Sequence, residues 1–193
     1  MKRIVVATKN EAKLKEIRPA LTHLGYELYS LLDFDMPDIE ETGRTLRENA
    51  LLKARAVRRT TDYIVLADDS GLEVEALGGA PGVHSKRFSD SAQDQDNNLL
   101  LIKKMATKEN RAAAFKTIMV LIMPDDREFS FEGTLHGYIH TSIEGEEGFG
   151  YDSVFIPVGH SKTLATLGMD VKNGISHRRR ALRKVADFLK GDR

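Results

Sequence analysis

The sequence predicts an α/β fold with a mixed β-sheet. Two observations lead to this class. Short apolar runs alternate with amphipathic helical segments in the first half of the chain, and a long β-hairpin pattern follows in the second half. The 193 residues suffice for one sizeable core. We therefore expect a single domain over residues 1–193, built as two lobes that share a central cleft.

The first half of the chain is expected to alternate strands and helices. In order, these are a strand at 4–7, a helix after Asn10, a strand at 27–32, a helix after Thr45 and a strand at 63–67. Asn10 caps the first helix and Gly25 ends it, while Pro19 should kink it because proline removes a backbone donor. Thr45 and Glu48 form a capping-box pattern at the start of the second helix.

The second half is expected to contain longer strands. In order, the pattern predicts an extended segment at 72–77, turns at 78–82, a helix at 92–107, hairpin strands at 113–123 and 128–139, a strand at 148–157 and a helix at 175–189. The helix at 92–107 carries an apolar stripe of Leu99, Ile102 and Met105. Because hairpins follow the alternating segments, the sheet should be mixed, with the functional site in loops at strand ends.

Composition excludes several classes of protein. The 29 basic and 29 acidic residues cancel, which removes the overall charge expected of a dedicated nucleic-acid binder. The chain has no cysteine, so disulfides, thiolate nucleophiles and cysteine-bound zinc are excluded. No apolar run is long enough for a membrane span or a signal peptide. We expect a cytoplasmic protein that binds neither nucleic acid nor membrane.

A first candidate site lies where the strand at 4–7 turns into a helix. Free backbone N–H groups and the helix dipole favour phosphate at such a turn, and Lys13 adds a positive charge. The segment consists of Thr8, Lys9, Asn10, Glu11, Ala12 and Lys13. It is not a Walker loop, since the glycines and the GK[ST] ending are missing. The alternative is an ordinary helix cap with a solvated lysine.

A second candidate site is the pair Asp68-Asp69, expected directly after the strand at 63–67. Two neighbouring carboxylates at the end of a buried strand repel each other and are partly desolvated, which a divalent cation would offset. Magnesium prefers one or two carboxylates, waters and phosphate oxygens, which this pair could supply with Glu40. A carboxylate that is not fully engaged by the metal can deprotonate a water molecule. The alternative is a turn capped by an aspartate.

A third candidate group combines an acidic loop with the helix that follows it. Glu40 and Glu41 lie in the loop, and Asn49 and Lys53 are four residues apart in the helix. This spacing places Asn49 and Lys53 on one helix face, so both could point into one pocket. Considered alone, the pattern also fits a solvated surface.

Two further segments could bind a nucleotide base. The glycines of Gly148–Asp152 allow close approach of the backbone, Phe149 and Tyr151 offer stacking surfaces, and Asp152 can accept from ring N–H groups. Near the last helix, Lys172 and Arg178 can donate to phosphate or to a base carbonyl. The alternatives are a tight turn with core aromatic residues and a solvated basic helix face.

Taken together, five segments closely resemble the non-standard purine NTP pyrophosphatase family, also called the inosine triphosphatase or Ham1-like family. They are TKNEAK at 8–13, EETG and ENA at 40–50, ADDSGLEVEALGGAPGVHSKRFS at 67–89, GFGYD at 148–152 and KNGISHR at 172–178. The resemblance implies an elongated two-lobed fold around a highly twisted mixed sheet, and a homodimer. It also implies Mg²⁺-dependent hydrolysis, or Mn²⁺-dependent hydrolysis, of ITP, dITP and XTP to the monophosphate and pyrophosphate, which removes them from the nucleotide pool.

The resemblance also implies roles for individual residues. The phosphate-binding residues fall on Thr8, Asn10 and Lys13, with Lys53 nearby. Glu40 and Asp69 correspond to the metal ligands, Asp69 also to the proton acceptor, and Ser70 to a substrate contact. The base pocket corresponds to Phe149, Gly150, Tyr151, Asp152, Lys172, His177 and Arg178. Because Glu41 follows Glu40 directly, the choice between these two ligands stays open.

The chain departs from the family's pattern at Lys86, Glu147 and Ser153. These positions lie beside the expected pocket and leave every mapped functional group in place. The departures therefore bear on substrate preference more than on activity.

Two other functions compete with this interpretation. A haloacid-dehalogenase-like phosphatase would use Asp33-Phe34-Asp35, with a covalent aspartyl phosphate at Asp33. A nucleic-acid-binding module would use the basic cluster at 178–184, with Phe149 and Tyr151 as stacking residues. The nucleic-acid-binding function leaves the acidic residues at 40, 41, 68 and 69 without a role near a polyanion.

Overall fold

The computed structural model describes residues 2–34 and 36–191 and confirms the α/β class. Its helices are α1 (Glu11–His23), α2 (Leu46–Arg58), α3 (Asp94–Met105), α4 (Leu164–Leu167), α5 (Met169–Ile175) and α6 (His177–Gly191), with 3-10 turns at Glu75–Leu77 and Gly82–Arg87. Its strands are β1 (Arg3–Val6), β2 (Glu27–Ser30), β3 (Ile64–Val74), β4 (Ala112–Ile122), β5 (Glu128–Ile139) and β6 (Phe155–Pro157).

These strands form one sheet in the order β2-β1-β3-β4-β5-β6. Strand β1 is parallel to both β2 and β3, whereas β5 and β6 are antiparallel. The sheet is therefore mixed, as the sequence predicts. No helix within 2–34 and 36–191 combines the length and the apolar character needed to cross a membrane.

The chain divides into two compact units. The first comprises Met1–Asp69, Thr117–Gly133 and Arg178–Arg193, and the second comprises Ser70–Lys116 and Thr134–His177. Each unit has a core of its own.

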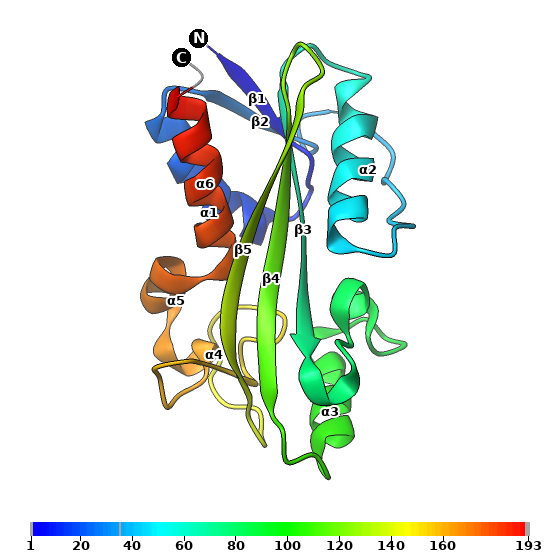
Figure 1. Cartoon of the computed structure of the whole chain (residues 1–193), viewed down its shortest axis with the longest axis vertical. Coiled ribbons are helices and arrows are strands. Elements are labelled where there is room, and N and C mark those ends of the chain that lie inside the picture. Colours follow the sequence, from blue (N-terminus) through cyan, green and yellow to red (C-terminus); the bar gives the residue numbers. More distant parts are fainter. Residues whose placement is uncertain (1, 35, 192–193) are drawn as a thin grey trace. The chain divides into compact units, whose positions relative to one another are not determined.

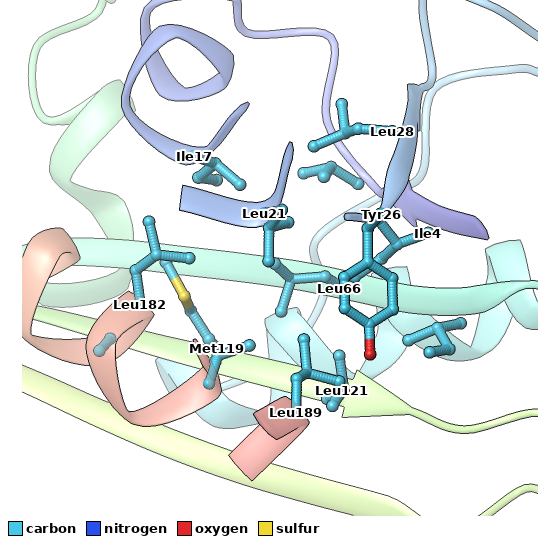
Figure 2. Packing of buried hydrophobic residues seen from close by; sticks show 14 of the residues in the cluster. Ile4, Ile17, Leu21, Tyr26, Leu28, Leu66, Met119, Leu121, Leu182 and Leu189 are labelled. Carbon is cyan, nitrogen blue, oxygen red and sulfur yellow. The ribbon is translucent and has the colours of Figure 1, made fainter. Parts of the chain in front are cut away.

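In the first unit, helices cover both faces of the sheet. On one face, α1 and α6 pack over Ile4, Leu66 and Leu121, and their side chains meet in a single apolar cluster (Figure 2). On the other face, α2 packs over Val5 and Val65 (Figure 1). The two sets of sheet residues alternate along each strand because successive side chains of a strand point to opposite faces.

The second unit has a separate apolar core. Leu72 and Val74 of β3 pack there with Leu101 and Met105 of α3 and with Phe155 of β6. Strand β3 therefore contributes to the cores of both units. Its central residues lie between the two apolar stretches.

The helix boundaries agree well with the prediction. Asn10 accepts a hydrogen bond from the Lys13 N–H at the start of α1, and Gly25 follows its end with a φ of 81°. Thr45 caps α2 by accepting from the Glu48 N–H at 3.1 Å. These short-range signals are set by local hydrogen bonding, which explains why the sequence identifies them.

Three predictions about elements are wrong. One continuous strand, β3, runs from the segment expected at 63–67 into the one expected at 72–77 and ends at Val74, where the 3-10 turn Glu75–Leu77 begins. The Asp68-Asp69 pair therefore lies within a strand and not after one. In the segment expected as a strand at 148–157, only Phe155–Pro157 is extended, since Gly148 and Gly150 have φ values of 89° and 65° that turn the chain.

The third error concerns the buried face of α3. Leu99 is 50% exposed, whereas Asn97 and Asn98 are buried beside Leu101. Hydrogen bonds account for this arrangement. The Asn97 side chain accepts from Ser89, and the Asn98 side chain donates to the Gly150 carbonyl.

Candidate active site

Asp68 and Asp69 point to opposite faces of β3. Asp68 continues the series of Leu66, which faces α1 and α6, and Asp69 continues the series of Val65, which faces α2. Their contacts agree with this alternation, since Asp68 pairs with Lys13 of α1 and Asp69 contacts α2. Two adjacent aspartates thus lie in different environments and need not share one cation.

Asp68 is a buried carboxylate surrounded by cations. Its Oδ2 lies 2.9 Å from Nζ of Lys13 and 3.6 Å from Nε of Arg178. Arg178 also donates from Nη1 to Glu16 at 2.9 Å. Burial opposes ionisation of Asp68, but the charges of Lys13, Arg178 and Lys53 outweigh it and hold its pKa well below the ordinary range. Asp68 therefore stays ionised.

Asp69 has the opposite electrostatic behaviour. Its Oδ2 accepts from Nδ2 of Asn49 at 3.2 Å, and its Oδ1 lies 3.8 Å from Nζ of Lys53. Burial, reinforced by the negative charge of Glu41, raises the pKa of Asp69 to about 6, although Lys53 opposes the shift. A carboxylate with this pKa is both ionised and basic near neutral pH, which suits a general base.

The face of α2 that contains Asn49 and Lys53 converges on Asp69, as the four-residue spacing predicts. Asn49 also accepts from the Gly43 N–H at 2.7 Å, which ties the acidic loop to α2. A Cβ at Gly43 would lie 2.6 Å from the Asn49 Oδ1, so only glycine permits this approach. Glu41 of the same loop pairs with Lys53 at 2.5 Å.

The strand-to-helix turn at 8–13 is tightly hydrogen-bonded. The Thr8 hydroxyl accepts from the Asn10 N–H at 3.1 Å, and Asn10 caps α1. Lys13 extends to Asp68, whereas Lys9 donates to Asp38 and to a backbone carbonyl. Burial lowers the pKa of Lys13 even though Asp68 opposes that shift. The prediction that this turn binds phosphate, with Glu11 and Ala12 included, stays a prediction.

The ion pairs around Asp68 and Asp69 contain three cations and four carboxylates. Their members are Lys13, Lys53, Arg178, Glu16, Glu41, Asp68 and Asp69. These carboxylates would repel a polyphosphate, and a bound divalent cation would offset that repulsion.

The donor set fits a magnesium ion that binds together with its substrate. Across 2–34 and 36–191, no group of three or more histidine, aspartate or glutamate side chains is arranged to hold a metal. Magnesium does not need such a cage, since one or two carboxylates, waters and substrate phosphates suffice. The raised pKa of Asp69 also fits a magnesium site, because a cation beside this carboxylate would favour its ionised form.

Of the residues predicted to bind the base, Arg178 belongs to the first unit and the others to the second. Asp152 accepts at Oδ2 from the Phe149 N–H at 2.9 Å and from Nζ of Lys172 at 2.5 Å. The same Lys172 ammonium lies 3.9 Å from the centre of the Phe149 ring. A Cβ at Gly148 would lie 2.2 Å from the Asp152 carboxylate, so glycine is required there. The sequence signals at 148–152 and at Lys172 thus belong to one cluster.

Other predicted residues lie in different surroundings. Tyr151 is buried, and its hydroxyl donates to the Ser85 carbonyl at 2.7 Å. His177 stacks on Phe115 with ring centres 4.8 Å apart. Ser70 is partly buried. Base binding by Tyr151, His177 and Arg178, and substrate contact by Ser70, stay predictions.

The three departures from the family's pattern are all engaged in contacts. Lys86 pairs with Asp94 at 2.9 Å, and Ser153 accepts from the Asn98 side chain at 3.2 Å. Glu147 accepts from the Met169 N–H at 2.8 Å. Each of these contacts joins two segments of the second unit.

The mixed sheet and the acidic pair beside Lys13, Lys53 and Arg178 are typical of an α/β enzyme that acts on phosphate groups. The chain belongs to the Ham1 family, whose model matches residues 4–188. A dITP/XTP pyrophosphatase of Exiguobacterium is 46% identical over 98% of this chain and 100% of that protein. One from Geobacter sulfurreducens is 45% identical over 98% of this chain and 97% of its own length.

Solved structures support the same membership. The Ham1 protein of Staphylococcus aureus is 37% identical, with a TM-score of 0.92 over 100% of both chains. The nucleoside-triphosphatase, or dITP/XTP pyrophosphatase, of Mycobacterium abscessus is 39% identical, with a TM-score of 0.80 over 95% of this chain and 98% of that one. The α/β fold with a mixed sheet and flanking helices, expected from the resemblance, is thus confirmed.

The competing phosphatase interpretation loses its support. The Asp33 carboxylate accepts from both the backbone N–H and the hydroxyl of Ser30, at 2.7 and 3.0 Å, and so closes the turn after β2. Asp35, the second aspartate of that motif, lies outside the described residues. Asp33 is therefore accounted for as a turn residue.

Proposed function

We propose that this chain hydrolyses ITP, dITP and XTP to the nucleoside monophosphate and pyrophosphate and so removes them from the nucleotide pool. Membership of the Ham1 family and the relatives named dITP/XTP pyrophosphatase support this activity. The observation that carries the proposal is the arrangement on β3. Asp68 pairs with Lys13 on one face, and Asp69, whose pKa burial raises to about 6, contacts Asn49 and Lys53 on the other.

Asp69 acts as the general base. In its ionised form this carboxylate accepts a proton from the water that attacks the α-phosphorus, and pyrophosphate leaves. Asn49 and Lys53 orient this carboxylate through the contacts at 3.2 and 3.8 Å. Asp68 remains paired with Lys13, and so keeps that ammonium beside the strand for the triphosphate.

Asp69 and Glu40 would hold a Mg²⁺ ion, for which Mn²⁺ could substitute. Glu41 is already paired with Lys53, which leaves the exposed Glu40 as the carboxylate available to the metal. When bound, the ion would neutralise triphosphate charge and stabilise the pyrophosphate leaving group. The carboxylates of the ion-pair cluster support this requirement, because they would otherwise repel the triphosphate.

The nucleotide is bound by the residues that the family resemblance implies. The triphosphate binds to the turn at 8–13, to Lys53 and to Ser70. The purine binds to Phe149, Gly150, Tyr151, Asp152, Lys172, His177 and Arg178. A pocket that donates to a 6-oxo group rejects adenine, because a buried donor would be left unpaired. The enzyme is a cytoplasmic homodimer that needs no nucleic acid and no membrane.

The test is a panel of ITP, XTP, GTP, ATP and dTTP with Mg²⁺, in which pyrophosphate and orthophosphate are measured separately. We expect pyrophosphate from ITP and XTP and little from the other three. Protein with Asp69→Asn, purified in parallel, controls for contaminating hydrolases. Orthophosphate as the first product, or equal turnover of all five nucleotides, would refute the proposed function.

A further inference from the structure

Helix α3 holds the peptide group on each side of Gly150. The Asp94 Oδ2 accepts from the Gly150 N–H at 2.7 Å, and the Asn98 Nδ2 donates to the Gly150 carbonyl at 2.9 Å. Asp94 and Asn98 are four residues apart and therefore lie on the same helix face. Both backbone polar groups of one glycine are thus bound to one rigid element.

The two α3 side chains are themselves fixed in place. Asn98 is 3% exposed and also donates to the Ser153 hydroxyl at 3.2 Å. Asp94 pairs with Lys86 at 2.9 Å. Burial opposes the ionisation of Asp94, but the Gly150 N–H and Lys86 outweigh it and lower its pKa. The hydrogen bond to Gly150 is therefore charge-assisted, which makes it stronger than a neutral one.

Gly150 lies at the centre of the proposed base pocket. It follows Phe149, whose ring lies under the Lys172 ammonium, and it precedes Asp152, which binds that ammonium. Gly148 and Gly150 both have left-handed φ values, a region that glycine enters freely but at a high cost in chain entropy on ordering. A loop with two such glycines needs external anchors to keep one conformation.

We propose that Asp94 and Asn98 are positioning residues for purine recognition. They hold the loop at 148–152 in its binding conformation, so that the nucleotide does not have to order the loop when it binds. Preorganisation of this kind strengthens binding without a new contact to the ligand. The proposal rests on the proposed function, because it assigns the role to the base pocket of that function.

The test compares Asp94→Ala with two matched variants in steady-state hydrolysis of ITP. Asp94→Ala removes the acceptor of the Gly150 N–H, and it should raise KM for ITP about tenfold while kcat stays within about twofold. Asp94→Asn keeps an acceptor oxygen and should restore most of the loss. Asp96→Ala removes another first-turn carboxylate, which accepts from Ser91, and should match the wild type.

A second measurement separates loop positioning from general damage. Inorganic tripolyphosphate, which has no base, should inhibit Asp94→Ala and the wild type with the same inhibition constant. An unchanged KM in Asp94→Ala, or an equal weakening of tripolyphosphate, overturns the positioning role while the proposed function stands. A wild type that releases no pyrophosphate from ITP or XTP overturns the proposed function, and the positioning role falls with it.

Discussion

The ion-pair cluster around β3 and the loop at 148–152 use buried charge in different ways. Around β3, cations lie beside two adjacent aspartates, and burial raises the pKa of Asp69 to about 6. At the loop, the buried pair of Asp152 with Lys172 of α5 closes the turn. Cations beside a carboxylate of raised pKa suit a site that binds a polyanion and moves a proton, whereas a closed ion pair suits a site that keeps its shape.

The largest expected effect is on the chemical step. Asp69→Asn keeps the shape of the side chain but removes the base, so kcat for ITP should fall about 10³-fold while KM changes little. Lys172→Met, in α5 beside the loop, should show the reverse pattern, with KM raised more than kcat is lowered. Asp33→Asn is the control and should retain activity, since Asp33 only closes the turn after β2. Loss of kcat in Asp33→Asn would restore the phosphatase interpretation.

The next effect is on stability. Asp68→Asn leaves the buried Lys13 and Arg178 facing a neutral group, and it should lower the free energy of unfolding by about 3–5 kcal/mol. Asp152→Asn removes the charged partner of only one cation, Lys172. Its decrease in the free energy of unfolding should therefore lie at the lower end of that range. Urea unfolding of both variants measures the difference. Equal losses would mean that the second cation beside Asp68 adds nothing.

The sequence predicts the helices and helix faces of these two regions better than the contacts between distant segments. The capping signals at Asn10 and Thr45 identify the helices, and the spacing of Asn49 and Lys53 places both on one face. All of these depend on contacts within one turn or one helix. The pairing of Lys172 with Asp152 is not visible in spacing, because the chain must fold before they meet.

The sequence pattern predicts that the strand ends before Asp68, whereas β3 continues to Val74. Charged residues are rare inside buried strands, so Asp68-Asp69 looks like the start of a loop. The strand continues because helices on each face supply the partners: Lys13 and Arg178 for Asp68, and Asn49 and Lys53 for Asp69. A period of two predicts opposite faces once the strand is known to continue.

The pH dependence of stability tests the raised pKa of Asp69 on β3 directly. Because folding raises the pKa of Asp69 from 3.8 to about 6, the folded state binds this proton more tightly than the unfolded state. The stabilisation from protonated Asp69 is complete below pH 3.8 and is lost as the pH rises through 6. Asp69→Asn should therefore be more stable than the wild type by up to about 3 kcal/mol at pH 8, and equally stable near pH 3.5. A difference that does not vary with pH would contradict the raised pKa.

The smallest expected effects distinguish the two neighbouring glutamates. Glu40→Gln should raise the Mg²⁺ concentration for half-maximal activity about tenfold, because it removes a proposed ligand. Glu41→Gln should instead shift the acidic limb of the kcat/KM profile to lower pH, since the Glu41 charge raises the pKa of Asp69. Activity measured over Mg²⁺ concentration and over pH separates the two roles. If Glu41→Gln changes the Mg²⁺ requirement and Glu40→Gln does not, Glu41 is the metal ligand, and the negative charge beside Lys53 belongs to the metal site.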